Sequence, residues 1–145
     1  MSERSGRILA VDYGVRRIGL ALSDPGKTVG FPLTTIRAGK DMRETVRLLS
    51  EAVRDYTIET IVIGLPLHLS GKESELSEIV RSFAGTLAEA YSAPLLFWDE
   101  RLTSKQAERL LIEGGVKRKK RGRYVDNISA SLILQSYLDS PRPPC

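Results

Sequence analysis

The sequence predicts an α/β domain built on a mixed five-stranded sheet with helices on both faces. Three segments rich in aliphatic and β-branched residues precede the first helical pattern, which is typical of an antiparallel meander. Two short apolar runs then alternate with helical patterns, as in parallel strands joined by crossover helices. No repeat or linker divides the 145 residues, so we expect one domain over 1–145, with its core at about 6–138 and a flexible tail at 139–145.

The composition is that of a globular protein from a reducing compartment. With 41% hydrophobic and 28% charged residues, it is neither disordered nor fibrous. No apolar run approaches the ~20 residues that cross a bilayer, and residues 1–6 lack the apolar core of a signal peptide. The one cysteine, Cys145, has no partner for an internal disulfide. We therefore expect a cytoplasmic protein with no membrane partner.

The meander occupies the first quarter of the chain. Its three strands are expected at residues 7–13, 17–24 and 28–37. The first two flank a short turn around Gly14 and form a hairpin. Because Pro32 cannot donate a hydrogen bond to a strand neighbour, the third strand should lie at an edge of the sheet.

Helices and strands alternate in the rest of the sequence. Helices are expected at about 41–56, 73–91, from Thr103 to Gly114-Gly115, and at 124–138, and strands at 60–66 and 95–98. Asp41 and Thr103 are the expected N-caps of the first and third helices. Right-handed crossovers would place the 60–66 strand beside the first strand, and the 95–98 strand beside that one. The carboxyl ends of these parallel strands then share an edge, where such sheets bind ligands.

A lone carboxylate, Asp12, stands where the first buried strand ends. Residues 8–11 have no helical period, and alternation puts Ile8, Ala10 and Asp12 on one face. An ionised carboxylate at this place is costly unless it is paired or bound to a metal ion. The alternative is an ordinary turn aspartate that caps the hairpin.

Further carboxylates are expected at the same edge of the sheet. Asp99 and Glu100 end the last strand, and Asp126 lies near the start of the last helix, whose small residues Ser129 and Ala130 allow a close approach to the sheet. Clustered carboxylates bind Mg²⁺ or Mn²⁺, and two such ions can activate water and stabilise the leaving oxygen of a phosphodiester. The sequence therefore favours metal-dependent hydrolysis of nucleic acid.

Positive charge is concentrated in one segment. The net charge is +4, and without the six cations within 117–123 it would be −2. We expect a basic loop at 116–123 that contacts phosphates and makes binding salt-dependent, although a merely solvated loop is the alternative. Arginines near the acids add to this set. The candidate nucleic-acid-binding residues are Arg16, Arg17, Arg101, Lys117, Arg118, Lys119, Lys120, Arg121 and Arg123.

The order of these motifs resembles the YqgF (RuvX) family over roughly residues 6–138. The segments that carry the resemblance are Asp12-Tyr13-Gly14, Arg17-Ile18-Gly19-Leu20-Ala21, Ser23-Asp24, Gly64-Leu65-Pro66, Asp99-Glu100-Arg101-Leu102-Thr103, and Asp126 ahead of Ile133-Leu134-Gln135-Ser136-Tyr137-Leu138. The resemblance implies a ribonuclease H-like fold. It also implies a bacterial nuclease, either one that matures the 5′ end of the 16S ribosomal RNA precursor or a Holliday junction resolvase, and it leans toward RNA.

The resemblance also implies a role for each acid. Asp12, Glu100 and Asp126 would be catalytic and would bind Mg²⁺ or Mn²⁺, with Asp99 in reserve for Glu100. Other ribonuclease H-like nucleases have an acid at the end of the fourth strand, where this chain has Gly64-Leu65-Pro66. This departure leaves the second ligand open.

Other functions share some of these features. An Asp-x-Gly hairpin is also the first phosphate loop of actin-like ATPases and sugar kinases, but those proteins need a second lobe. A non-catalytic nucleic-acid-binding module would fit the missing acid of the fourth strand. A resolvase would act as a symmetric dimer; no heptad or long apolar stripe indicates one, so a monomer and a weak homodimer both remain open. His68, the one histidine, is either an ordinary loop residue or a substrate contact.

Overall fold

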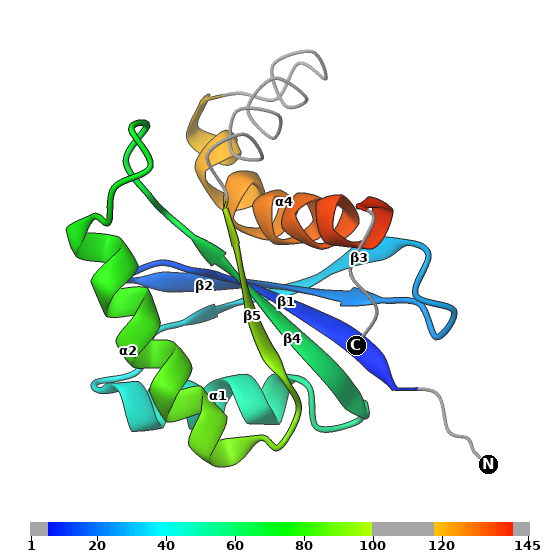
Figure 1. Cartoon of the computed structure of the whole chain (residues 1–145). Helices are drawn as coiled ribbons and strands as arrows, with labels where there is room; N and C mark the ends of the chain where they lie inside the picture. The colour runs from blue at the N-terminus through cyan, green and yellow to red at the C-terminus, as the bar shows by residue number, and fades with distance from the viewer. Residues whose placement is uncertain (1–5, 100–117, 141–145) are drawn as a thin grey trace.

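The fold is a five-stranded sheet with helices on both faces (Figure 1). The computed structural model describes residues 6–99 and 118–140, and for residues 118–127 the backbone alone. The strands are β1 (Arg7–Tyr13), β2 (Arg17–Ser23), β3 (Gly30–Arg37), β4 (Ile58–Leu65) and β5 (Leu95–Asp99). The helices in these ranges are α1 (Met42–Ala52), α2 (Glu75–Ala90) and α4 (Arg118–Asp139), and none of them is long and apolar enough to span a membrane.

The strand order is β3-β2-β1-β4-β5, as the sequence predicts. β1, β2 and β3 pair as an antiparallel meander, and β4 and β5 run parallel to β1. Pro32 lies in the edge strand β3, where the register of β2 and β3 shifts between Leu20 and Ala21. The carboxyl ends of β1, β4 and β5 therefore meet at one edge of the sheet.

Helices α1 and α2 cover one face of the sheet with large apolar side chains. Leu49 of α1 and Phe83 and Leu87 of α2 have no exposed area, and they pack against the alternate residues Leu9 and Val11 of β1. Burying each such side chain contributes about 1.5–3 kcal/mol. The hydrophobic periodicity of the sequence predicts this face well because it combines a period of two in the strands with a helical period in α1 and α2.

Helix α4 crosses the other face (Figure 1), where the buried strand residues include two alanines. Ala10, Ala21 and Ala130 are fully buried, so helix and sheet approach closely, as predicted from Ser129 and Ala130. Trp98 of β5 donates its indole N–H to Ser136 of α4 at 3.1 Å and meets the Tyr137 ring edge-on, with centroids 5.6 Å apart. These two contacts join α4 to β5.

The start of α4 corrects one sequence prediction. We expected a basic loop at 116–123 followed by a helix at 124–138, but α4 runs from Arg118 to Asp139, so residues 118–123 are helical. Lysine and arginine are good helix formers, and the one glycine among them, Gly122, costs only about 1 kcal/mol relative to alanine. A cluster of charge is therefore not a loop signal. The helix expected between Thr103 and Gly115 lies outside the described residues.

Helical spacing in the sequence predicts that Tyr56 and Ile79 face the sheet, and both predictions are wrong. Helix α1 ends at Ala52 rather than near residue 56, because i→i+3 hydrogen bonds from Arg54 to Glu51 and from Tyr56 to Val53 turn the chain away. Tyr56 is 36% exposed. Ile79 of α2 is 38% exposed.

The turn between β1 and β2 depends on a glycine. A Cβ atom at Gly14 would lie 2.5 Å from the carbonyl oxygen of Arg17, a separation that real Cβ atoms do not adopt. Because Gly14 has no side chain, the turn can close tightly, and Tyr13 and Ile18 form the strand pair next to it.

Replacing Gly14 by alanine should therefore destabilise the protein, by roughly 1–3 kcal/mol, because the turn must open or become strained. Gly85 is a matched control: it lies in α2 and an added Cβ meets nothing within 4 Å. Gly85→Ala should raise the free energy of unfolding by about 0.5–1 kcal/mol, since alanine favours the helix. Denaturant unfolding of the two variants measures both effects, and a shift of the same sign in both would contradict this view of the turn.

Candidate active site

Asp12 lies near the carboxyl end of the central strand β1. It stands opposite Gly19 of β2, and on its other side β1 pairs with β4 up to Val11 and Ile63. Strand alternation puts Asp12 on the same face as Ala10, which α4 covers. The side chain is half-buried. Gly19 places no side chain beside the carboxylate.

The residue after Asp12 anchors the strand end on the opposite face. The ring of Tyr13 packs against Phe83 of α2, with centroids 4.7 Å apart. Burial raises the pKa of the Tyr13 hydroxyl, so this group stays neutral at physiological pH. Strand pairing on both sides and this ring contact hold Asp12 in a fixed place.

Strand β4 offers no carboxylate beside Asp12. Val62 of β4 belongs to the face under α4, and two positions further along this face is Gly64, which pairs with Trp98 of β5. The next residue, Leu65, is buried on the other face. Gly64 has no side chain that could coordinate a metal ion, so a second ligand has to come from another element.

Asp99 ends β5 on the opposite side of the sheet from Asp12. It pairs with Leu65 and follows the alternation of Leu95 and Phe97, whereas Trp98 packs on the α4 face. The sequence predicted Asp99 as a reserve for Glu100, and this placement makes Asp99 the poorer partner for Asp12. Glu100, together with Arg101 and Lys117, lies outside the described residues.

Helix α4 carries Asp126 toward the same face as Asp12. Asp126 precedes Ala130 by four residues and Ile133 by seven, and both of these pack on the face of β1 that holds Asp12. This spacing places Asp126 on the sheet side of the helix backbone. Arg118, Lys119, Lys120, Arg121 and Arg123 form the first turns of α4. Among the side chains that the structure describes, no three acidic, histidine or cysteine groups converge on a metal position.

Arginines surround a pocket at the tip of the β1–β2 hairpin. The two predicted nucleic-acid ligands there, Arg16 and Arg17, are exposed. The residues that line the pocket are Val15, Arg16, Arg17, Arg37, Ala38 and Gly39. Arg37 was missed by sequence reasoning because its place depends on the β2–β3 register, in which it faces Arg17.

The loop between β4 and α2 carries His68 at the same edge of the sheet. The backbone N–H of His68 donates to the carbonyl of Lys72 at 2.9 Å, and its own carbonyl accepts from Gly71 at 2.8 Å. Gly71 has a φ of 90°, which a glycine adopts readily. The side chain of His68 is exposed, so its place is compatible with both interpretations made from the sequence.

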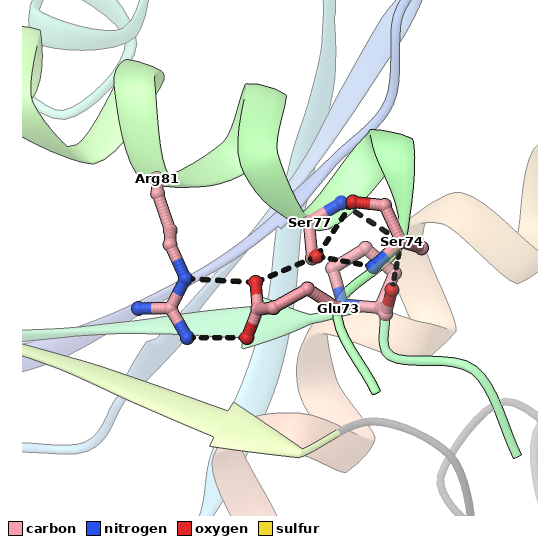
Figure 2. A network of polar contacts seen from close by, with 5 residues as sticks. Glu73, Ser74, Ser77 and Arg81 are labelled. Carbon is pink, nitrogen blue, oxygen red and sulfur yellow. Dashed lines mark hydrogen bonds and ion pairs between the residues drawn. The ribbon is translucent and has the colours of Figure 1, made fainter. Parts of the chain in front are cut away.

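A polar network fixes the far end of this loop (Figure 2). Ser74 is the N-cap of α2; its hydroxyl accepts from the Ser77 N–H at 2.9 Å and donates to the carbonyl of Pro66 at 2.5 Å. Glu73 accepts two hydrogen bonds from Arg81, at 3.0 and 2.8 Å. The loop is therefore closed at its base, and its end is tied to the first turns of α2.

Arg81 also connects this network to β5. Its guanidinium lies over the ring of Phe97, 4.9 Å from the ring centroid. One side chain thus joins the loop after β4, helix α2 and the strand that leads to Asp99 and Glu100. This link ties the loop after β4 to β5, the strand that precedes the expected second ligand.

Comparison of the sequence with known families and proteins gives consistent matches over nearly the whole chain. The model of the family described as "RuvX: Holliday junction resolvase" matches residues 6–140. A protein of Protochlamydia amoebophila (strain UWE25) is 47% identical over 143 residues, covering 94% of this chain and 95% of the relative. One of Roseiflexus sp. (strain RS-1) is 42% identical over 142 residues, covering 98% and 100%. Both relatives carry the name "Putative pre-16S rRNA nuclease".

Solved structures show the same fold. RuvC of T. thermophilus in complex with a Holliday junction substrate superposes with a TM-score of 0.56 at 16% identity, covering 92% of this chain and 96% of that one. The Fowlpox virus resolvase in complex with Holliday junction DNA gives 0.55 at 15% identity, covering 92% and 97%. At these identities the likeness establishes the fold, and it confirms the ribonuclease H-like architecture implied by the motifs.

The carboxyl group of Glu73 should titrate at an unusually low pH because it is paired with Arg81. The hydrogen bonds from Arg81 and then from the Ser77 hydroxyl lower the pKa of Glu73 from 4.5 to about 2. Because the folded-state pKa is depressed, the ionised carboxylate supports the loop above pH 4.5, and this support is lost as the pH falls toward 2. The pair is exposed, so the effect is local rather than global.

A carbon-detected NMR titration of the Glu73 carboxyl group measures this shift. In the Arg81→Gln variant, the midpoint should rise from about 2 toward the ordinary value of 4.5, because the largest cause of the shift is removed. A midpoint that does not move in the variant would show that Arg81 is not the partner that holds Glu73 ionised.

Proposed function

Since the chain belongs to the RuvX family, we propose that it is a divalent-metal-dependent nuclease that cleaves phosphodiester bonds in structured nucleic acid. We propose the 5′ end of the 16S ribosomal RNA precursor as its substrate, in the bacterial cytoplasm. Support for RNA comes from the names of the relatives that are 42–47% identical to it.

The observation that carries the proposal is the place of Asp12. Its carboxylate stands at the carboxyl edge of the central strand, on the face that α4 crosses, between Gly19 and the Gly64 position. A partly buried carboxylate whose strand neighbours are glycines is well suited to hold a cation against a phosphate. A turn aspartate that merely caps a hairpin has no need of this central position.

The oxygen donors of this site suit Mg²⁺ or Mn²⁺. Asp12, Glu100 and Asp126 would hold the ion. The position of Asp126, four residues before Ala130, supports its role. Glu100 is favoured over Asp99 because Asp99 lies on the opposite face of the sheet from Asp12. When bound, such ions activate a water molecule and stabilise the leaving oxygen of the phosphodiester. Holding the metal is thus the task that we assign to the three carboxylates.

The basic residues bind and orient the substrate in this proposal. Arg16 and Arg17 lie at the hairpin turn that follows Asp12. The lysines and arginines of 118–123 lie on the first turns of α4. Arg101 and Lys117 stay in the proposed set of nucleic-acid-binding residues on the ground of the sequence alone. Contacts of this kind neutralise backbone phosphates and release counterions, so binding should weaken steeply as salt is added.

A resolvase acting on branched DNA is the second candidate, and the description of the matching family favours it. Cutting two strands of a junction symmetrically would require a dimer. Cleavage of a 16S precursor RNA and of a four-way DNA junction, assayed side by side with Mg²⁺ or Mn²⁺, separates the two substrates. Tight binding of both without cleavage of either would favour a non-catalytic module.

Asp12→Asn tests the catalytic assignment. It should lower cleavage by at least about 100-fold, since losing even an outer partner of a metal ligand typically costs 10–100-fold. Nucleic-acid binding without metal should stay equal or become tighter, because a negative charge is removed. Asp55→Asn is the matched control, since Asp55 is exposed in the turn before β4, at the opposite edge of the sheet. Equal cleavage by Asp12→Asn and Asp55→Asn would refute the proposal.

A further inference from the structure

We propose that the pocket lined by Arg16, Arg17 and Arg37 binds a backbone phosphate of the substrate and directs that strand across β2 and β3. The inference rests on the proposed function, because it takes nucleic acid as the ligand. It adds Arg37 to the binding residues and gives the substrate a path away from Asp12.

The β-sheet register places Arg37 on the same face as Asp12. Asp12 pairs with Gly19, and two residues further along β2 is Arg17, which pairs with Arg37 of β3. Alternation by twos keeps all four residues on one face of the sheet. Two residues along a strand and two strands across amount to about 12 Å between the Cα atoms of Asp12 and Arg37. At ~3.4 Å of helix axis per nucleotide, this distance is about three to four nucleotides.

The charges of the pocket indicate an anionic ligand. Arg17 and Arg37 stand directly opposite each other on neighbouring strands, so their side chains project from the same face of the sheet. The six described residues that line the pocket include three arginines and no acid. Phosphate fits best, because the planar guanidinium fork donates two parallel hydrogen bonds to its oxygens.

The backbone around the pocket is already hydrogen-bonded. Three successive N–H groups of the segment after β3 have partners inside the protein: Ala38 donates to the Arg16 carbonyl at 2.9 Å, Gly39 to the Thr45 hydroxyl at 2.8 Å, and Lys40 to the Glu44 carboxylate at 2.6 Å. Recognition therefore falls to the arginine side chains.

The same bonds make the rim of the pocket rigid. They tie the end of β3 to the hairpin tip on one side and to the first turn of α1 on the other. Gly39 allows this close approach, since a Cβ there would lie 2.7 Å from side-chain atoms of Glu44. The arginines thus project from a frame that is set before the substrate arrives, which lowers the entropic cost of binding.

The proposal is tested by the salt dependence of RNA binding to the full chain. A fluorescein-labelled RNA stem–loop with a single-stranded tail is titrated in EDTA, so that cleavage plays no part, and anisotropy is followed over a series of salt concentrations. Arg37→Gln is compared with Arg54→Gln, a matched control in which an exposed arginine at the opposite edge of the sheet loses its charge. Arg37→Lys keeps the charge without the fork.

Arg37→Gln should weaken binding several-fold and flatten the slope of log affinity against log salt by about 0.7–0.9, the share of one phosphate. Arg37→Lys should keep the slope and lose part of the affinity. Arg54→Gln should bind like the parent chain. Arg37→Gln indistinguishable from Arg54→Gln, or no RNA binding by the parent, would overturn the inference. A parent that binds through Arg37 but cleaves neither RNA nor DNA with Mg²⁺ would overturn the nuclease proposal alone.

Discussion

Keeping a carboxylate partly buried at the end of the central strand is the constraint on which the rest of the site depends. Asp12 is fixed by strand pairing with β2, by the neighbouring β1–β4 ladder and by the packing of Tyr13 on Phe83. Its neighbours Gly19 and Gly64 add no side chain beside it. Burying a carboxylate is costly unless it is paired, hydrogen-bonded or bound to a metal ion, and this constraint links the fold to its proposed chemistry.

The two faces of the sheet have different roles: one holds most of the apolar core, and the other carries the candidate site. The face under α1 and α2 holds the large apolar side chains and supplies most of the stability. The face under α4 uses alanines, so the helix lies close to the strand that carries Asp12. The arginine pocket continues this second face past the hairpin tip. Stability and binding are therefore separated in space, and surface changes at the pocket should leave the core intact.

Much of the fold follows from local patterns in the sequence. Period-two and helical runs predict all five strands and their order, and Asp41 caps α1 as expected, with its carboxylate accepting from the Glu44 N–H at 2.8 Å. The start of α4 was missed because charge was taken as a loop signal, although lysine and arginine favour a helix. Tyr56 was placed in α1 because a periodic pattern does not show where tertiary turns end a helix.

The candidate site was predictable in part. Asp12 is prominent because a carboxylate interrupts an apolar run. That Asp99 faces away from Asp12 can be seen only from the pairing of β4 with β5. That Arg37 lies opposite Arg17 can be seen only from the β2–β3 register, which shifts near Pro32. Such relations join residues far apart in the chain, so they become visible only when the strands are aligned in three dimensions.

The central claim, that Asp12 anchors a divalent cation on the α4 face, is tested most directly by adding small amounts of Mn²⁺ and mapping paramagnetic broadening of the backbone amide NMR signals. The amides of Gly19 and Gly64, on either side of Asp12, should lose intensity first, and Asp12→Asn should abolish this effect. Broadening that centres on Asp99 and the α2 side, or that persists unchanged in Asp12→Asn, would contradict the claim.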